Sequence, residues 1–318
     1  MKRIYMLLIA TFLVFTLSAC GEEIETGDNV IYVTVYPMEY LIESIAGDTV
    51  DVVRVPGTSN HADSIEWSFK EIIAMKEADI LFYINGGADN YITNKIATFQ
   101  EGDVELVDMS QHLDYNNVCY NHSHEEDTHS LVEETCDQTA LSPDPHFWLD
   151  PVRMKEAAIF VKDKLIARYP DNQELYNNNF TILNASLEQL NTDYETMASL
   201  ATKPVITTVM LFTYWHERYE IEIMSITTDP HSSEVVPGDI IDFVNHALDE
   251  SQHYILFEKN VNSPAGEQVL QALKEYDPNA NALFLHGLGS ITQAESEAGM
   301  NYLTIMYDNL EVLNESSK

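Results

Sequence analysis

The segment Asp144-Pro-His-Phe-Trp-Leu-Asp-Pro151 places one histidine between two Asp-Pro pairs and beside two aromatic residues. One interpretation is a strand-to-helix turn, in which proline restricts the backbone and Asp150 caps a helix that begins at Pro151. That interpretation leaves His146 without a role. Because imidazole is the commonest metal ligand among side chains, the other interpretation is that the turn holds His146 ready to bind a metal ion.

Two more histidines follow segments that are predicted to be strands. His61 comes after the strand expected at 50–55, and His286 directly follows the one expected at 282–285. Each alone is typical of an ordinary loop, but ligands of open α/β sheets bind beyond the carboxyl ends of the strands. Three such histidines, drawn from both halves of the chain, predict a metal site in a cleft. Three neutral imidazoles suit zinc, whereas manganese prefers carboxylate oxygens.

The elements that must position these histidines can be read from the periodicity. Segments rich in β-branched and aromatic residues alternate with segments of helical period, and this happens once on each side of residues 172–201. The alternation predicts an α/β fold of two Rossmann-like lobes, each a parallel sheet flanked by helices. Residues 172–201 lack glycine and proline and predict one connector helix ~45 Å long. The predicted boundaries are an N-terminal lobe at 30–170, a connector at 171–202 and a C-terminal lobe at 203–318.

The first residues predict export and a lipid anchor. Two basic residues precede an apolar run at 4–17, which is too short to span a bilayer comfortably. Leu17-Ser-Ala-Cys20 resembles a bacterial lipobox, although an ordinary signal peptide with a chance cysteine is the alternative. We therefore expect a signal peptide at 1–19 and a lipidated tether at 20–29, which places the protein at the extracytoplasmic face of the cell membrane.

The net charge of the chain bears on which kinds of ligand it can bind. A formal net charge of −36 repels phosphates and argues against nucleic-acid binding.

Between 112 and 142 the periodicity stops, and His122, His124 and His129 lie among acidic residues. This composition is typical of an auxiliary metal-attracting loop, and the alternative is an acidic loop without a metal role.

The two remaining cysteines, Cys119 and Cys136, lie in or beside the same loop. Outside the cytoplasm a pair of thiols tends to oxidise, so we predict a disulfide between them. Two free thiols, or two soft metal ligands, are the alternatives.

On these motifs the chain resembles the solute-binding lipoproteins of zinc and manganese ABC importers (cluster A-I, family 9). The resemblance covers essentially the whole mature chain. It implies one ion held between the lobes by four side chains, two from each lobe. His61 and His146 match the first pair. The third position falls on Val209, which cannot ligate, and the fourth, an aspartate in the family, falls on His286. The matching segments are the lipobox, Pro56-Gly57 with His61, residues 144–151, the connector helix, Phe212 with Tyr219, and Leu285-His-Gly-Leu-Gly289.

The resemblance implies a monomeric receptor, not an enzyme, that delivers zinc to a cognate ABC permease. Zinc members of the family carry a histidine- and acid-rich loop at this place, so a loop histidine is a candidate for the missing ligand. Two alternatives remain. One is a degenerate paralogue or adhesin-like surface lipoprotein with weak metal binding. The other is a zinc hydrolase, in which Glu258 at a strand end is the only general base that can be named.

Overall fold

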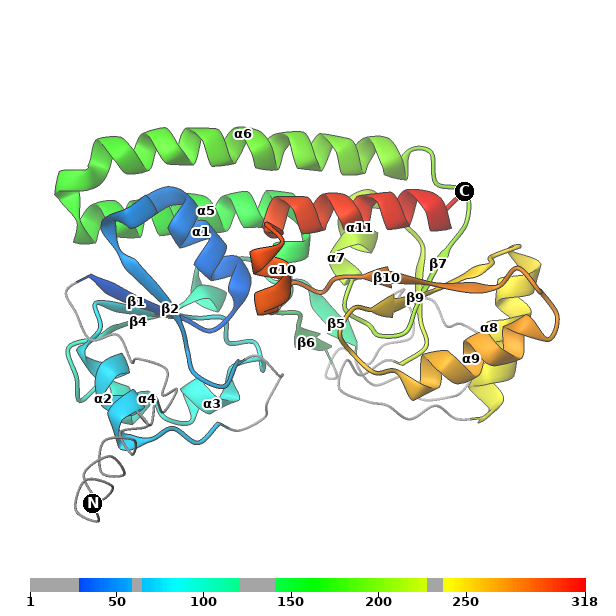
Figure 1. The fold of residues 1–318 in the computed structure, drawn as a ribbon, viewed down its shortest axis with the longest axis horizontal. Helices are drawn as coiled ribbons and strands as arrows, with labels where there is room; N and C mark the ends of the chain where they lie inside the picture. Colours follow the sequence, from blue (N-terminus) through cyan, green and yellow to red (C-terminus); the bar gives the residue numbers. More distant parts are fainter. Residues whose placement is uncertain (1–28, 59–64, 120–140, 228–236) are drawn as a thin grey trace, which may run out of the picture.

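Two four-stranded parallel sheets form the framework of the protein (Figure 1). The computed structural model describes residues 29–58, 65–119, 141–227 and 237–318. The strand orders are β2-β1-β3-β4 and β10-β9-β7-β8, and neighbouring strands are parallel in both sheets. The predicted fold class is confirmed. The strands are β1 (Val30–Val33), β2 (Asp51–Arg54), β3 (Ile80–Tyr83), β4 (Glu105–Asp108), β7 (Val205–Thr207), β8 (Ile223–Ser225), β9 (Tyr254–Glu258) and β10 (Asn281–Leu285).

Helices make the crossovers that parallel strands require. Ser68 starts one of them with a capping box, in which its hydroxyl and the Glu71 carboxylate each accept a backbone N–H of the other residue. Residues 90–99 form two short helices, interrupted at Asn94-Lys95. The crossover helices are α1 (Tyr36–Ala46), α2 (Phe69–Glu77), α3 (Asn90–Thr93), α4 (Ile96–Phe99), α7 (Thr213–Tyr219), α8 (Pro237–Asp249) and α9 (Pro264–Lys274). The short helix α10 (Gln293–Glu297) follows the last strand.

Three long helices join the two lobes. Figure 1 shows α6 (Gln173–Ala198) running along the molecule, next to α5 (Pro151–Arg168) and α11 (Tyr302–Ser316). Its buried residues recur at helical spacing, so one face of α6 packs on its neighbours. One apolar core cluster follows this layer and includes Ile31 of the first sheet and Leu256 of the second. The two sheets are therefore connected by packing as well as by the chain.

A short antiparallel hairpin, absent from the sequence-based expectations, leads into the Asp-Pro segment. It pairs β5 (Asn117–Cys119) with β6 (Leu141–Pro143), so that Cys119 lies opposite Leu141. The pairing therefore places two residues that are 22 positions apart in sequence side by side. Among the helices of the described ranges, none combines the length and the apolar character needed to cross a bilayer.

Candidate metal centre

The Asp-Pro segment is buried at the joint between the two lobes. Asp144 is fully buried, and its Oδ1 accepts both the backbone N–H of His146 (3.0 Å) and the ring Nδ1–H (2.6 Å). Two residues of α7, in the second lobe, contact the same aspartate. Thr213 donates its hydroxyl to the Asp144 carboxylate, and Tyr214 donates to the Asp144 carbonyl at 2.7 Å. The first histidine of the site is thus fixed by side chains from both lobes.

The contact with Asp144 sets the tautomer of His146. A carboxylate accepts hydrogen bonds, so the proton of a neutral His146 ring resides on Nδ1 and the lone pair of Nε2 is free. A histidine that donates one ring N–H to a carboxylate while the other nitrogen faces outward is the usual arrangement of a metal-binding histidine. The Trp148 ring meets the His146 ring edge-on, with 5.3 Å between centroids. His146 is therefore prepared to ligate through Nε2.

Further hydrogen bonds anchor the segment to the second lobe. Trp148 donates its indole N–H to the carbonyl of Gly287 at 2.8 Å, and Tyr302 donates to the carbonyl of Trp148 at 2.7 Å. Trp215 donates its indole N–H to the carbonyl of Leu149 at 2.8 Å. Buried carbonyls left without these donors would cost free energy, so the bonds fix the place where the lobes meet.

A buried charge network secures the end of the segment. Asp150 caps α5, as predicted, by accepting the backbone N–H of Val152 at 2.9 Å. Its other oxygen accepts Nη1 of Arg153 at 2.8 Å, and Nε (3.0 Å) and Nη2 (2.8 Å) of Arg218 on α7. A buried carboxylate needs such compensation, because an unpaired charge there would be strongly destabilising.

His286 follows β10 directly, as expected, but its ring is engaged within the second lobe. Its Nδ1 accepts the backbone N–H of Leu288 at 2.9 Å, and its own backbone exchanges hydrogen bonds with the side chain of Asn309. Burial lowers the pKa of His286, although the Glu295 carboxylate opposes that effect. In the neutral ring the proton therefore resides on Nε2, which lies 3.5 Å from Glu295 Oε1 without a hydrogen bond. Neither ring nitrogen offers a free lone pair in this arrangement.

Glu295 is a permanently charged neighbour of His286. Burial alone would raise the pKa of Glu295, but hydrogen bonds from Thr292 and Lys259 outweigh it and bring the pKa to about 2. The ammonium of Lys259 lies 3.0 Å from Glu295 Oε1. This carboxylate is already paired.

Glu258 ends β9 beside β10, and its carboxylate interacts electrostatically with His146. Its register partner is Leu285, the residue before His286. Burial raises the pKa of Glu258 to about 7, and a charged His146 ring would lower it. The sequence indicated only an acid at a strand end. Its electrostatic interaction with His146 depends on how the strands are arranged, which is not visible in the sequence.

The remaining predicted site residues are not brought together by the described structure. His61, Cys20, Cys136 and the loop histidines His122, His124 and His129 lie outside the described residues. Within those residues no group of three or more His, Cys, Asp and Glu side chains is arranged to hold a metal ion. Cys119 ends β5, and Val209 is buried after β7, where its side chain offers no ligand.

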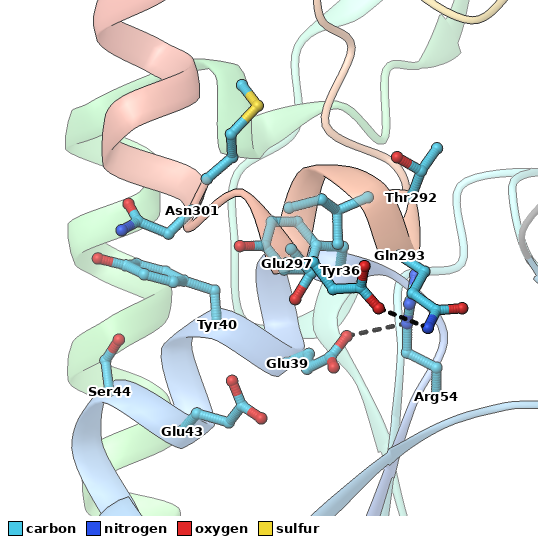
Figure 2. A pocket seen from close by; sticks show the side chains of 13 residues that line it. Tyr36, Glu39, Tyr40, Glu43, Ser44, Arg54, Thr292, Gln293, Glu297 and Asn301 are labelled. Carbon is cyan, nitrogen blue, oxygen red and sulfur yellow. Dashed lines mark hydrogen bonds and ion pairs between the residues drawn. The ribbon is translucent and has the colours of Figure 1, made fainter.

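A separate pocket of about 620 Å³ lies on the seam between α1 and the segment of the second lobe that carries α10 (Figure 2). Glu39 in this pocket forms an ion pair with Arg54, with 3.0 Å between Oε2 and Nε. Burial raises the pKa of both Glu39 and Glu43. A backbone hydrogen bond of 3.2 Å from Tyr36 N–H to Gly289 O crosses the seam nearby. None of the candidate metal ligands lines this pocket.

Comparisons with known proteins agree with this architecture. A family model described as ZnuA, the periplasmic component A of a zinc-uptake complex, matches residues 31–316. The zinc-binding lipoprotein AdcA of Streptococcus pneumoniae strain R6 is 24% identical over 318 residues, which cover 100% of this chain and 61% of that protein. The high-affinity zinc uptake system protein ZnuA of Bacillus subtilis strain 168 is 24% identical over 301 residues, which cover 94% of this chain and 91% of that protein. The chain thus spans only about 61% of the length of AdcA.

Solved structures share the fold at low sequence identity. The Zn(II)-bound ZnuA-like domain of S. pneumoniae AdcA superposes with a TM-score of 0.71 at 23% identity, covering 92% of this chain and 99% of that domain. The laminin-binding protein Lmb of Streptococcus agalactiae, described as a bifunctional adhesin and metal transporter, gives a TM-score of 0.72 at 20% identity. It covers 92% of this chain and 100% of its own. At these identities the likeness establishes the fold alone.

Proposed function

The chain belongs to the ZnuA family of periplasmic zinc-uptake components, and from that premise we propose that it is an extracytoplasmic zinc receptor serving an ABC permease. The family works in transport, so the protein is a binding protein and not an enzyme. The relatives with zinc in their names, S. pneumoniae AdcA and B. subtilis ZnuA, support zinc as the cargo.

The observation that carries this proposal is the state of His146. Its Nδ1–H is held by Asp144 at 2.6 Å, its Nε2 is free, and it lies where the lobes meet. A carboxylate–histidine pair of this kind orients an imidazole for zinc and raises its basicity. A metal with donors from both lobes binds more tightly to the arrangement in which the lobes are joined. A permease would then recognise that arrangement.

We propose His61, His146 and His286 as zinc ligands. His146 can ligate through Nε2 without giving up a hydrogen bond of its ring. His286 first has to give up the hydrogen bond that its Nδ1 accepts from the Leu288 N–H, because only then can the ring proton move and free Nε2. The loop histidines His122, His124 and His129 are proposed as an auxiliary zinc-attracting segment.

The placement of the chain in the cell is part of the proposal. Cys20 is the proposed lipidation site that anchors a monomer to the outer face of the membrane. A disulfide between Cys119 and Cys136 is also proposed. The proposed boundaries of the lobes and the connector are 30–170, 171–202 and 203–318.

Metal analysis combined with one substitution tests the proposal. Protein purified without chelator and supplemented with zinc is expected to contain one zinc ion per chain by elemental mass spectrometry. His146→Ala is expected to lose calorimetrically measurable high-affinity binding while keeping its circular dichroism spectrum. Absence of zinc from the wild-type protein, or unchanged affinity in the variant, would refute the receptor function at this site.

A further inference from the structure

The short helix α7 of the second lobe is fixed to the segment that carries His146. Four of its seven residues donate a hydrogen bond to residues 144–151. The donors are Thr213, Tyr214, Trp215 and Arg218, and the acceptors are Asp144, Leu149 and Asp150. Because Thr213 and Arg218 lie near opposite ends of α7, the helix is held against the segment along most of its length.

The two carboxylate oxygens of Asp144 have different partners. Oδ1 accepts the backbone N–H and the ring Nδ1–H of His146, which belongs to the same lobe. Oδ2 accepts the hydroxyl of Thr213, which belongs to the other lobe. Asp144 is fully buried and Thr213 is 7% exposed, so solvent does not readily replace either partner. The two oxygens are chemically equivalent, and these partners therefore decide which of them faces His146.

Loss of the Thr213 hydroxyl would free the Asp144 carboxylate to turn. The terminal torsion of an aspartate is broad, so the group would settle where its remaining hydrogen bonds are best. A buried oxygen without a donor costs free energy, which drives that reorientation. The Nδ1–H of His146 would then be held less firmly. A neutral imidazole without a fixed acceptor adopts either tautomer, so Nε2 would offer its lone pair for only part of the time.

We propose that Thr213 is a positioning residue for zinc binding, through which the second lobe fixes the Asp144 carboxylate and so keeps His146 ready to ligate. This inference rests on the proposed receptor function. Thr213 acts only through Asp144 and is not itself a ligand. The relay crosses between the lobes, because Thr213 belongs to α7 whereas Asp144 and His146 belong to the Asp-Pro segment of the first lobe.

The relay makes the state of a first-lobe ligand depend on the arrangement of the two lobes. A displacement that carries α7 away from residues 144–151 removes the Thr213 hydroxyl from Asp144, and it loosens His146 at the same time. Zinc affinity is then highest while the lobes are joined and falls when they separate. A permease that separates the lobes would thereby promote release of the ion.

Chelator competition with the full mature chain tests the relay. Thr213→Val keeps the shape of the side chain but replaces the hydroxyl with a methyl group. The zinc dissociation constant is expected to rise about tenfold, the lower end of the range for groups that support a metal ligand. Thr213→Ser keeps the hydroxyl and is expected to retain the wild-type dissociation constant.

Thr34→Val is the matched control. The Thr34 hydroxyl donates to Asp89 Oδ2 at 2.7 Å in the first lobe, and both residues are buried like the Thr213 pair. This variant also loses a buried bond from a hydroxyl to a carboxylate. It is therefore expected to lose stability in urea unfolding, as Thr213→Val does, but to keep the wild-type zinc affinity. Equal affinity losses in the two variants would overturn the inference.

A second measurement needs no metal. The ring ¹⁵N chemical shifts of His146 near pH 8, assigned by comparison with His146→Ala, are expected to place the proton on Nδ1 in the wild-type protein and in Thr213→Ser. Thr213→Val is expected to show a mixture of both tautomers. Wild-type shifts or wild-type affinity in Thr213→Val would overturn the relay and leave the receptor function standing. Failure of the wild-type protein to bind zinc would instead remove the receptor function, and with it the role of Thr213 in zinc binding.

Discussion

The indole N–H of Trp148 donates to the carbonyl of Gly287 at 2.8 Å. This bond joins the segment that carries His146 to the segment that carries His286, although the two are 139 residues apart in sequence. Trp148 belongs to the first lobe and Gly287 to the second. The bond therefore helps to hold the two segments that carry the candidate ligands in a fixed relative position.

Trp148→Phe is expected to weaken both folding and zinc binding. The variant keeps an aromatic ring but leaves the Gly287 carbonyl without its donor, at a cost of about 1–2 kcal/mol in the free energy of unfolding. Urea unfolding of the metal-free protein measures that loss. Tyr194→Phe is the control, because it removes a similar buried bond to a carbonyl, that of Met306, away from the site. It is expected to lose stability without losing affinity. Equal affinity losses in both variants would contradict a specific role for Trp148.

Asp144→Asn tests how His146 is prepared. The amide keeps the shape of the side chain, but the charge that holds the Nδ1–H is lost, so the zinc dissociation constant is expected to rise about 10- to 100-fold. Chelator competition at fixed pH provides the measurement. Asp108→Asn, which changes a carboxylate at the end of β4 with its own local hydrogen bonds, serves as the control. An unchanged dissociation constant in Asp144→Asn would mean that the tautomer of His146 does not matter for binding.

The pH dependence of the metal-free protein reports on Glu258. Its pKa rises from an ordinary value of 4.5 to about 7 on folding, mainly through burial. The charged form is thus disfavoured in the folded state. The resulting destabilisation is absent below the unfolded pKa, grows as the pH rises from 4.5 to about 7, and is complete above that range.

Glu258→Gln should therefore stabilise the metal-free protein at high pH. The expected gain is on the order of 1–3 kcal/mol near pH 8 and close to zero near pH 4. Thermal unfolding in the presence of a chelator, recorded at both pH values, measures it. A gain of equal size at both pH values would show that the charge of Glu258 is not the cause.

Gly287→Ala is expected to displace the Glu258 carboxylate. The new methyl group would lie 2.5 Å from Glu258 Oε1 and 2.6 Å from Leu211 Cδ2, and such overpacking typically costs about 1–3 kcal/mol. Zinc affinity should fall as well. A double-mutant cycle with Glu258→Ala checks the cause, because removing the carboxylate should relieve part of the strain. Strictly additive stability changes would place the strain elsewhere.

The fold was largely predictable because its signals are local. The strand at Ile80–Tyr83 is a short apolar run, and α5 begins at the predicted Asp150 cap. The hairpin of β5 and β6 was missed, since its strands have three residues each and pair across the 21-residue segment between Cys119 and Leu141. Such pairing leaves no periodic pattern in the sequence.

The sequence indicated which strands two of the candidate ligands follow, but not the chemical state of their rings. His286 directly follows β10, as the strand pattern indicated, whereas His146 follows β6 of the hairpin that the pattern did not indicate. The sequence does not show which ring nitrogen carries the proton. That depends on the Asp144 carboxylate for His146 and on the Leu288 N–H for His286. The proximity of Glu258 to Leu285 requires knowing that β9 and β10 are neighbours, and that is a property of the sheet and not of either segment. His61 remains a prediction.

The apolar cluster that runs without interruption from Ile31 of the first sheet to Leu256 of the second has a consequence for how the chain denatures. Lobes that share one interior cannot melt separately, so calorimetry should record a single heat-absorption peak for the whole chain. A bound cargo ion would then move that entire peak upward, even though it touches only a few side chains, because ligand stabilisation applies to the complete cooperative unit.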